Sequence, residues 1–257
     1  MQRPAPLAAL PFPLGILAPR LSALRPPAGP FDPRGDWRLA YGVYTMAGGA
    51  GSRVGALRLA RKAGAGEAFA LSVDYDKIVV AGNRQRVTAR LHCRADRLAT
   101  PGRWTFTSRL IDSSGVPIPD TLLEKSATVV DGQIEIDDGR SKRRLPVPQA
   151  YTVNWALLEA VTRLPREPFG PLEFTLLDHF DQLKPGQTLG YRESVRVGLG
   201  GQTARLEVYD QVGRGVVPWV YGCDEQGRPL LAASGLEAYL LEPPPNPSHQ
   251  PRSVPTA

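Results

Sequence analysis

The sequence predicts a mostly β protein, built as a curved antiparallel sheet or half-barrel that one amphipathic helix covers. Three observations support this fold class. Apolar and polar side chains alternate with a period of two over most of the chain from Trp37 onward. Glycine-bearing dipeptides separate the alternating runs, as two-residue hairpin turns require. The long helical crossovers that join parallel strands are missing, which favours an antiparallel meander.

The clearest strand covers residues 84–95, where even-numbered side chains are mostly basic and odd-numbered ones are mostly apolar. This pattern is typical of a strand with one buried face and one wet face. Residues 69–76 and 104–110 alternate in the same way. Shorter strands are expected over residues 39–46, 54–61, 124–130, 133–137, 173–178, 188–197, 204–210, 216–221 and 236–241.

Turn chemistry agrees with these strands. Asp131-Gly132 and Gly200-Gly201 each separate two runs, at points where a hairpin needs positive φ. The closing stretch, residues 213–241, reads as a strand, a glycine-bearing turn, a second strand and a third one. The chain therefore ends on antiparallel pairing.

One segment, residues 152–164, has helical rather than strand periodicity. Thr152 can cap its start, an apolar stripe follows, and Pro165 forbids continuation. The stripe consists of Leu157, Leu158, Val161 and Leu164. We expect this amphipathic helix to cover one face of the sheet, since it lacks the basic polar face of a membrane-surface helix.

Prolines divide the 257 residues into a central domain and two tails. Of 26 prolines, nine lie in residues 1–33 and six in residues 243–255, where they disfavour ladders and long helices. The predicted organisation is a Pro-rich segment at 1–34, one antiparallel β domain at 35–242 and a disordered tail at 243–257. Residues 7–18 have the length and charge order of a signal-peptide core, but prolines interrupt them and no A-x-A site follows.

Charge and cysteine content exclude several classes of function. The net charge of +6 is modest and spread out, which favours solubility over a nucleic-acid partner. The two cysteines, Cys93 and Cys223, are too few for a zinc site, so we expect neither a metal nor another cofactor. A disulfide between them stays open, because sequence alone does not give their separation.

The basic row of residues 84–95 is a candidate docking surface. It consists of Arg84, Arg86, Arg90 and Arg94. Regular guanidiniums on a sheet face suit phosphates or anionic lipid head groups, so peripheral contact with an anionic membrane is one expectation. Sheets that bind single-stranded nucleic acid present stacking rings on the same face, and here only His92 accompanies the arginines.

One candidate catalytic group surrounds His179. Asp178 and Asp181 flank this histidine, and such a trio could act as a general base in a hydrolase. The sequence contains neither a G-x-S-x-G elbow nor an H-E-x-x-H motif to supply the remaining chemistry. A surface turn is the favoured interpretation, and the hydrolase is an alternative.

The C-terminal third resembles an uncharacterised bacterial envelope domain family. The resemblance rests on NWALLEAVTRLP, on EFTLLDHFDQLKPGQTLGY and on the closing VPWVYGCDEQGRPLL, where the most similar positions are Pro218, Trp219, Asp224, Gly227 and Leu230. Such domains look like the antiparallel half-barrels of periplasmic lipoprotein carriers. The resemblance implies a helix lying across a concave face that shelters apolar ligand, and a periplasmic or secreted location.

We therefore expect a non-enzymatic envelope protein that binds a lipid or an acylated partner on the concave face of its sheet. The alternatives are the hydrolase and a structural module that docks a protein through the basic row. Each lining candidate is also compatible with an ordinary core position. The candidates are Phe69, Val73, Leu91, Trp104, Phe106, Leu206 and Val208.

Overall fold

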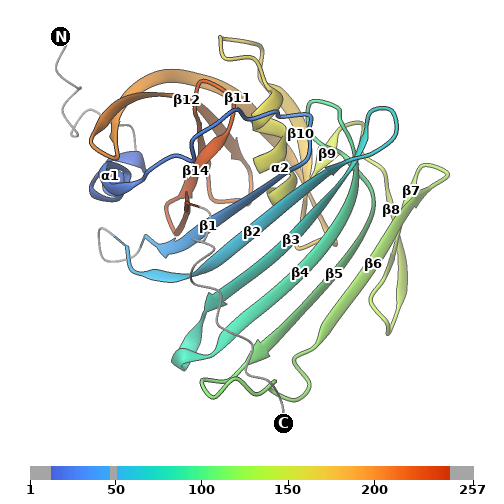
Figure 1. The fold of residues 1–257 in the computed structure, drawn as a ribbon. Helices are drawn as coiled ribbons and strands as arrows, with labels where there is room; N and C mark the ends of the chain where they lie inside the picture. Colours follow the sequence, from blue (N-terminus) through green and yellow to red (C-terminus); the bar gives the residue numbers. More distant parts are fainter. Residues whose placement is uncertain (1–12, 47–50, 244–257) are drawn as a thin grey trace.

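The protein folds as one open, curved sheet of fifteen strands, which confirms the mostly β fold class (Figure 1). The computed structural model describes residues 13–46 and 51–243. The spatial order is β8-β7-β6-β5-β4-β3-β2-β1-β15-β14-β13-β12-β11-β10-β9, so the chain forms two meanders that join where β1 pairs with β15. Neighbouring strands are antiparallel, except that β9 runs parallel to β10. Hairpin connections explain most of this order, since consecutive strands pair from β1 to β8 and from β10 to β15, whereas β8 and β9 form the two edges of the sheet.

The strands of the first meander are β1 (Trp37–Thr45), β2 (Arg53–Ala63), β3 (Ala68–Ile78), β4 (Arg84–Arg94), β5 (Pro101–Ile111), β6 (Leu123–Val130), β7 (Gln133–Asp137) and β8 (Lys142–Pro146). Those of the second are β9 (Tyr151–Thr152), β10 (Leu172–Asp178), β11 (Gln182–Leu199), β12 (Gln202–Gly213), β13 (Trp219–Cys223), β14 (Pro229–Ser234) and β15 (Glu237–Leu241). The sheet thus lies within the predicted domain at 35–242. The three-part division of the chain stays a prediction.

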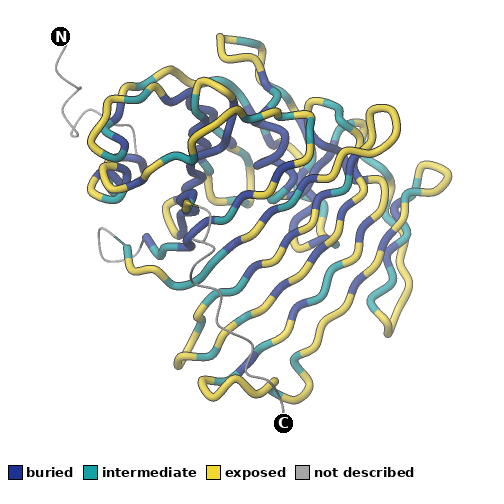
Figure 2. Tube along the Cα trace, viewed as in Figure 1, coloured by how far each residue is buried: buried dark blue, intermediate teal, exposed yellow. Residues whose placement is uncertain are grey.

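Alternation along the strands produces two faces, visible as alternating burial in β2 to β5 (Figure 2). Strand β4 follows the expected pattern, with its arginines exposed and its apolar side chains buried. Register places Tyr41, Leu57, Tyr75 and Val87 in one row on the same side. We call this side the concave face, because helix α2 (Asn154–Ala160) lies against it, and the opposite side the convex face.

Helix α2 lies in the hollow of the sheet and contacts β10 and β14 (Figure 1). The predicted helix at 152–164 is confirmed in place, but its start was wrong. Thr152 belongs to β9 and pairs with Leu176, so the helix begins at Asn154 without a side-chain cap. Because Thr152 pairs within the sheet, it does not cap the helix. A 3-10 turn, η3 (Val161–Arg163), follows, and extended backbone at Leu164 ends the helical segment before Pro165.

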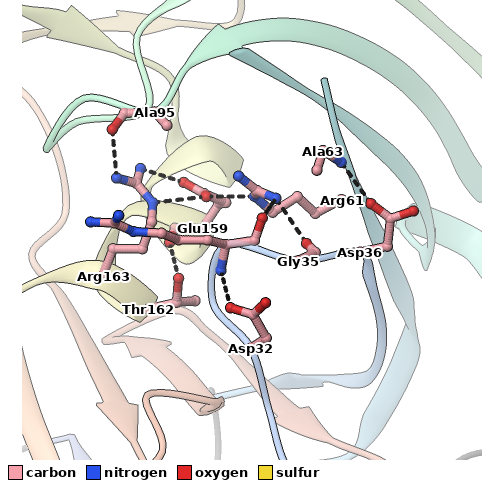
Figure 3. Close-up of polar contacts among 10 residues, drawn as sticks. Asp32, Gly35, Asp36, Arg61, Ala63, Ala95, Glu159, Thr162 and Arg163 are labelled. Atoms are coloured by element: carbon pink, nitrogen blue, oxygen red, sulfur yellow. Dashed lines mark hydrogen bonds and ion pairs between the residues drawn. The ribbon is translucent and has the colours of Figure 1, made fainter. Parts of the chain in front are cut away.

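A buried ion network anchors α2 to the first meander (Figure 3). The Glu159 carboxylate is fully buried and accepts hydrogen bonds from the Arg61 Nε at 3.0 Å and from the Arg163 Nε at 2.9 Å. Arg163 also donates from Nη2 at 2.7 Å and from Nη1 to the Ala95 carbonyl. Arg61 donates to the Gly35 carbonyl at 2.8 Å. Because every charged group has a partner, the network holds the helix over the sheet.

The second helix, α1 (Leu14–Ala23), lies inside the predicted Pro-rich segment at 1–34. It buries Leu14, Leu17 and Leu21 although Pro19 interrupts its hydrogen bonding. It contacts β11 and lies on the convex face, where the Arg20 guanidinium stacks 4.9 Å from the Tyr44 ring (Figure 1). Apolar burial therefore outweighs the proline penalty here. Residues 1–12 and the tail at 244–257 lie outside the described residues.

Two predicted hairpin turns have the expected backbone. Asp131 and Gly132 have φ of 48° and 72°, and Gly200 and Gly201 have φ of 56° and 83°. Positive φ at both central residues matches the right-handed twist of the flanking strands. Among the described residues, no helix is long and apolar enough to cross a membrane.

Candidate functional site

A cavity of ≈ 230 Å³ lies on the concave face between the two meanders and α2, and we call it the concave cavity. Strands β3, β4 and β5 border it on one side, and β13, β14 and β15 on the other. Its lining is Tyr75, Gln85, Val87, Phe106, Val153, Asn154, Trp155, Leu158, Leu177, Asp178, His179, Phe180, Trp219, Tyr221, Ala232 and Tyr239. The pairing of the two meanders through β1 and β15 is therefore needed to assemble this site.

Six aromatic rings follow one another across the concave cavity. In order they are Trp219, Tyr239, Tyr75, Trp155, Phe180 and Phe106. Successive ring centroids are 5.2, 6.4, 5.9, 5.9 and 5.0 Å apart. These spacings are those of favourable aromatic pairs. The arrangement forms a rigid, mainly apolar wall that runs from β13 to β5.

A tight turn between β10 and β11 places Phe180 in this wall. His179 and Phe180 both have positive φ, 50° and 64°, and the Asp181 amide closes the turn on the Asp178 carbonyl at 3.2 Å. Such a conformation is strained for a phenylalanine. Lys125 stabilises it by donating to the His179 carbonyl at 3.0 Å and to the Asp181 carboxylate at 2.7 Å. A side chain of the first meander thereby stabilises the β10–β11 turn of the second meander.

A polar pocket of ≈ 340 Å³ adjoins the concave cavity and shares Asn154, Asp178 and Trp219 with it. Its charged groups are paired. Lys77 contacts Glu237, and the Lys184 Nζ lies 2.5 Å from an Asp178 carboxylate oxygen. The apolar wall therefore borders a region of neutralised charge.

The two tyrosines of the wall, Tyr75 and Tyr239, remain hydrogen-bond donors. Burial, with Glu237 beside it, raises the pKa of Tyr75 well above 10.0. The same two causes raise the pKa of Tyr239. The Tyr75 hydroxyl donates to the Glu237 carboxylate at 3.1 Å. Both phenols stay protonated across the physiological pH range.

The structure distributes the seven lining candidates over both faces of the sheet. Phe106 borders the concave cavity, and Phe69, Val73, Leu91 and Trp104 share its face by register. The other two candidates, Leu206 and Val208, lie on the convex face. Tyr209, the residue after Val208, pairs with Tyr221 on the concave side, and neighbouring residues in a strand face opposite ways. A ligand in the cavity would not touch these two.

Several cavity residues were not among the lining candidates named from sequence. They are Tyr75, Trp155, Phe180, Trp219 and Tyr239. Alternation marks Tyr75 as inward-facing, and the resemblance marks Trp219. For Trp155 the available signal was its place at the start of the helix. No local signal marks Phe180, because its inward position depends on the turn conformation.

The hydrolase trio does not form a nucleophile and base. His179 is 77% exposed, and its Nε2 lies 3.7 Å from an Asp178 oxygen. Asp181 instead forms ion pairs with Lys125 and Arg143. No serine, threonine or cysteine side chain hydrogen-bonds to His179 among the described residues. The surface-turn interpretation fits this geometry better than general-base chemistry.

The basic row lies on the convex face, and acidic neighbours neutralise part of it. Arg84 and Arg86 both pair with Asp76, at 2.8 and 3.1 Å, and Arg94 lies 3.5 Å from Asp96. Arg90 is exposed on the same face. These exposed pairs contribute little to stability. Contact with an anionic membrane or a protein partner through this row stays a prediction.

The cysteines are separate, buried thiols, so the disulfide that was left open is not formed. Burial raises the pKa of both thiols above 9.0. Cys93 lies near Glu159 of α2, whereas Cys223 approaches the Val161 carbonyl at 4.0 Å. Within the described part of the chain, no group of three or more His, Cys, Asp or Glu side chains could hold a metal ion.

Comparison with known proteins supports the architecture. No protein-family model matches the chain, and no curated protein matches it. A solved structure that is similar is a beta-barrel-like protein of a domain of unknown function, DUF1849, from Brucella abortus. It has a TM-score of 0.52 and 10% sequence identity, and the match covers 82% of this chain and 97% of the other. At this identity the likeness establishes the fold, and the resemblance to an uncharacterised bacterial half-barrel domain is confirmed.

Proposed function

We propose that the protein is a non-enzymatic binder of an apolar ligand, namely an acyl chain of a lipid or of an acylated partner, in the concave cavity. The observation that carries the proposal is the aromatic wall around an unfilled space between α2 and the sheet. The hollow is open to solvent, so its apolar rings present surface that an apolar ligand would remove from water. Apolar pockets with a few convergent polar groups are typical binding sites.

The size of the concave cavity limits the ligand. Its ≈ 230 Å³ lies slightly below the usual range of about 300–1,000 Å³ for small-molecule sites. A single short acyl segment therefore fits better than a two-chain lipid. The rest of a longer chain would extend beyond the cavity through its open side.

The test is titration with phenylnaphthylamine, a neutral dye that fluoresces in apolar surroundings. The matched variants are Ala232→Leu, which fills the concave cavity, and Ala70→Leu, which adds the same side chain to the convex face of β3. Ala232 is fully buried between Tyr221 and Tyr239. We expect saturable binding by the wild type and by Ala70→Leu, and loss of about tenfold or more in affinity for Ala232→Leu.

Two outcomes would contradict the proposal. The first is the absence of saturable binding to the folded wild-type protein. The second is equal binding by the wild type and Ala232→Leu, because the dye would then occupy another surface.

The compartment is part of the same proposal. We infer a periplasmic or secreted protein from the resemblance to envelope half-barrels. Fractionation of bacterial cells that produce the chain with its own N-terminus tests this, and recovery entirely in the cytosol would contradict it.

A further inference from the structure

The polar pocket beside the concave cavity contains a buried hydrogen-bond donor that has no partner. Gln211 lines this pocket and is fully buried. Its Oε1 accepts a hydrogen bond from the Tyr221 hydroxyl at 2.8 Å, which orients the amide. Its Nε2 has no hydrogen-bond partner among the described residues. A buried amide donor without an acceptor is costly, so this atom indicates a missing acceptor.

The Tyr221–Gln211 pair links the two spaces. Tyr221 lines the concave cavity, whereas Gln211 lines the polar pocket. Asn154 and Trp219 border both. A ligand whose apolar end lies along the aromatic wall can therefore extend its polar end toward the Gln211 Nε2. The Asn154 amide, at the exposed start of α2, offers a second donor at this boundary.

The charges of the polar pocket indicate which polar end fits. Lys77 is paired with Glu237, and Lys184 with Asp178, so the two ammonium groups are already neutralised. The two carboxylates are 11% and 10% exposed. They would repel an incoming anion, whose desolvation no free cation would offset. A neutral acceptor avoids both the repulsion by the carboxylates and the cost of desolvating a charge.

We propose that the polar end of the ligand is an uncharged carbonyl, from an acyl ester or acyl amide, that accepts a hydrogen bond from the Gln211 Nε2. The protein then prefers esterified or amidated acyl chains to free fatty acids. This inference rests on the proposed function, because it assigns the polar end of a ligand whose chain fills the concave cavity.

The experiment compares three competitors of equal chain length against phenylnaphthylamine at neutral pH: methyl octanoate, octanoate and octane. We expect methyl octanoate to displace the dye at a concentration about tenfold lower than either of the others, since it alone satisfies the donor without adding charge. Gln211→Met removes the donor and should abolish the preference for the ester over octane. Gln202→Met makes the same exchange at an exposed position of the same strand, β12, and should retain that preference.

The outcomes separate this inference from the proposed function. Equal displacement by methyl octanoate and octane in the wild type overturns the carbonyl assignment and leaves apolar binding intact. Stronger displacement by octanoate overturns the charge argument. An ester preference that persists in Gln211→Met overturns the role of Gln211. Failure of the dye to bind the folded wild type overturns the proposed function itself. The wild-type comparison stays decisive if Gln211→Met does not fold.

Discussion

Replacement of Glu159 by glutamine should strongly destabilise the protein, because this carboxylate is the shared partner of two buried guanidiniums. It is fully buried and accepts bonds of 3.0, 2.9 and 2.7 Å from Arg61 and Arg163. Glutamine keeps the shape but removes the charge and presents an amide group to a guanidinium. Breaking a buried pair by removing one partner costs about 3–5 kcal/mol.

Remaining contacts place the expected loss near the lower end of that range. Arg61 retains the Gly35 carbonyl and Arg163 retains the Ala95 carbonyl. A loss of about 3 kcal/mol would lower the melting temperature by roughly 6–12 °C for a domain of this size. The assay is urea unfolding followed by tryptophan fluorescence, with Glu167→Gln at an exposed position as the matched control. A loss below about 1 kcal/mol, or one equal to that of the control, would refute the reasoning.

Three other outcomes are expected. Cys93 and Cys223 should resist a thiol reagent in the native protein and both react in urea, because they are free and buried; rapid native reaction would show that the core around them is open. Ala156→Leu, at a filled position of α2, should lower the free energy of unfolding by about 1–3 kcal/mol. The loss for Ala232→Leu should be smaller, because Ala232 is equally buried but borders the concave cavity; equal losses in urea melts would indicate that the added side chain does not enter the cavity. The Ser114 hydroxyl and the backbone amides of the same loop hold the pKa of Asp112 below 3.8. Its contribution to stability is therefore present above the unfolded pKa and lost as the pH falls through the folded one; an NMR titration midpoint above 3.8 would contradict this.

The strands that sequence analysis located most clearly are those with one wet face. In β4 the exposed arginines alternate with buried apolar residues, so the period of two is visible without any tertiary information. Strand β8 was missed because Lys142–Pro146 lies largely exposed at the sheet edge and carries no alternation. Strand β14 is buried on both faces, so its sequence is a continuous apolar run without alternation. Only its position after a glycine-bearing turn indicated that it is a strand.

The candidate site was less accessible to sequence reasoning. Alternation separates two faces but does not tell which one is concave where both are buried, and register places Leu206 and Val208 on the face opposite the concave cavity. Helix α1, which lies on the convex face, was not predicted, because prolines in and around it argue against a helix. The position of Phe180 in the wall depends on two residues with positive φ and on Lys125 from a distant strand. Register between the two meanders, a long-range property, assembles the site.

The most direct test of ligand binding in the concave cavity is methyl NMR of the protein titrated with phenylnaphthylamine. Val87, Leu158 and Leu177 line the cavity, whereas Leu206 and Val208 are buried on the convex face and serve as internal controls. We expect saturable shifts and dye contacts at the first three and none at the last two. Shifts confined to the convex-face methyls, or spread equally over all five, would contradict binding in the concave cavity.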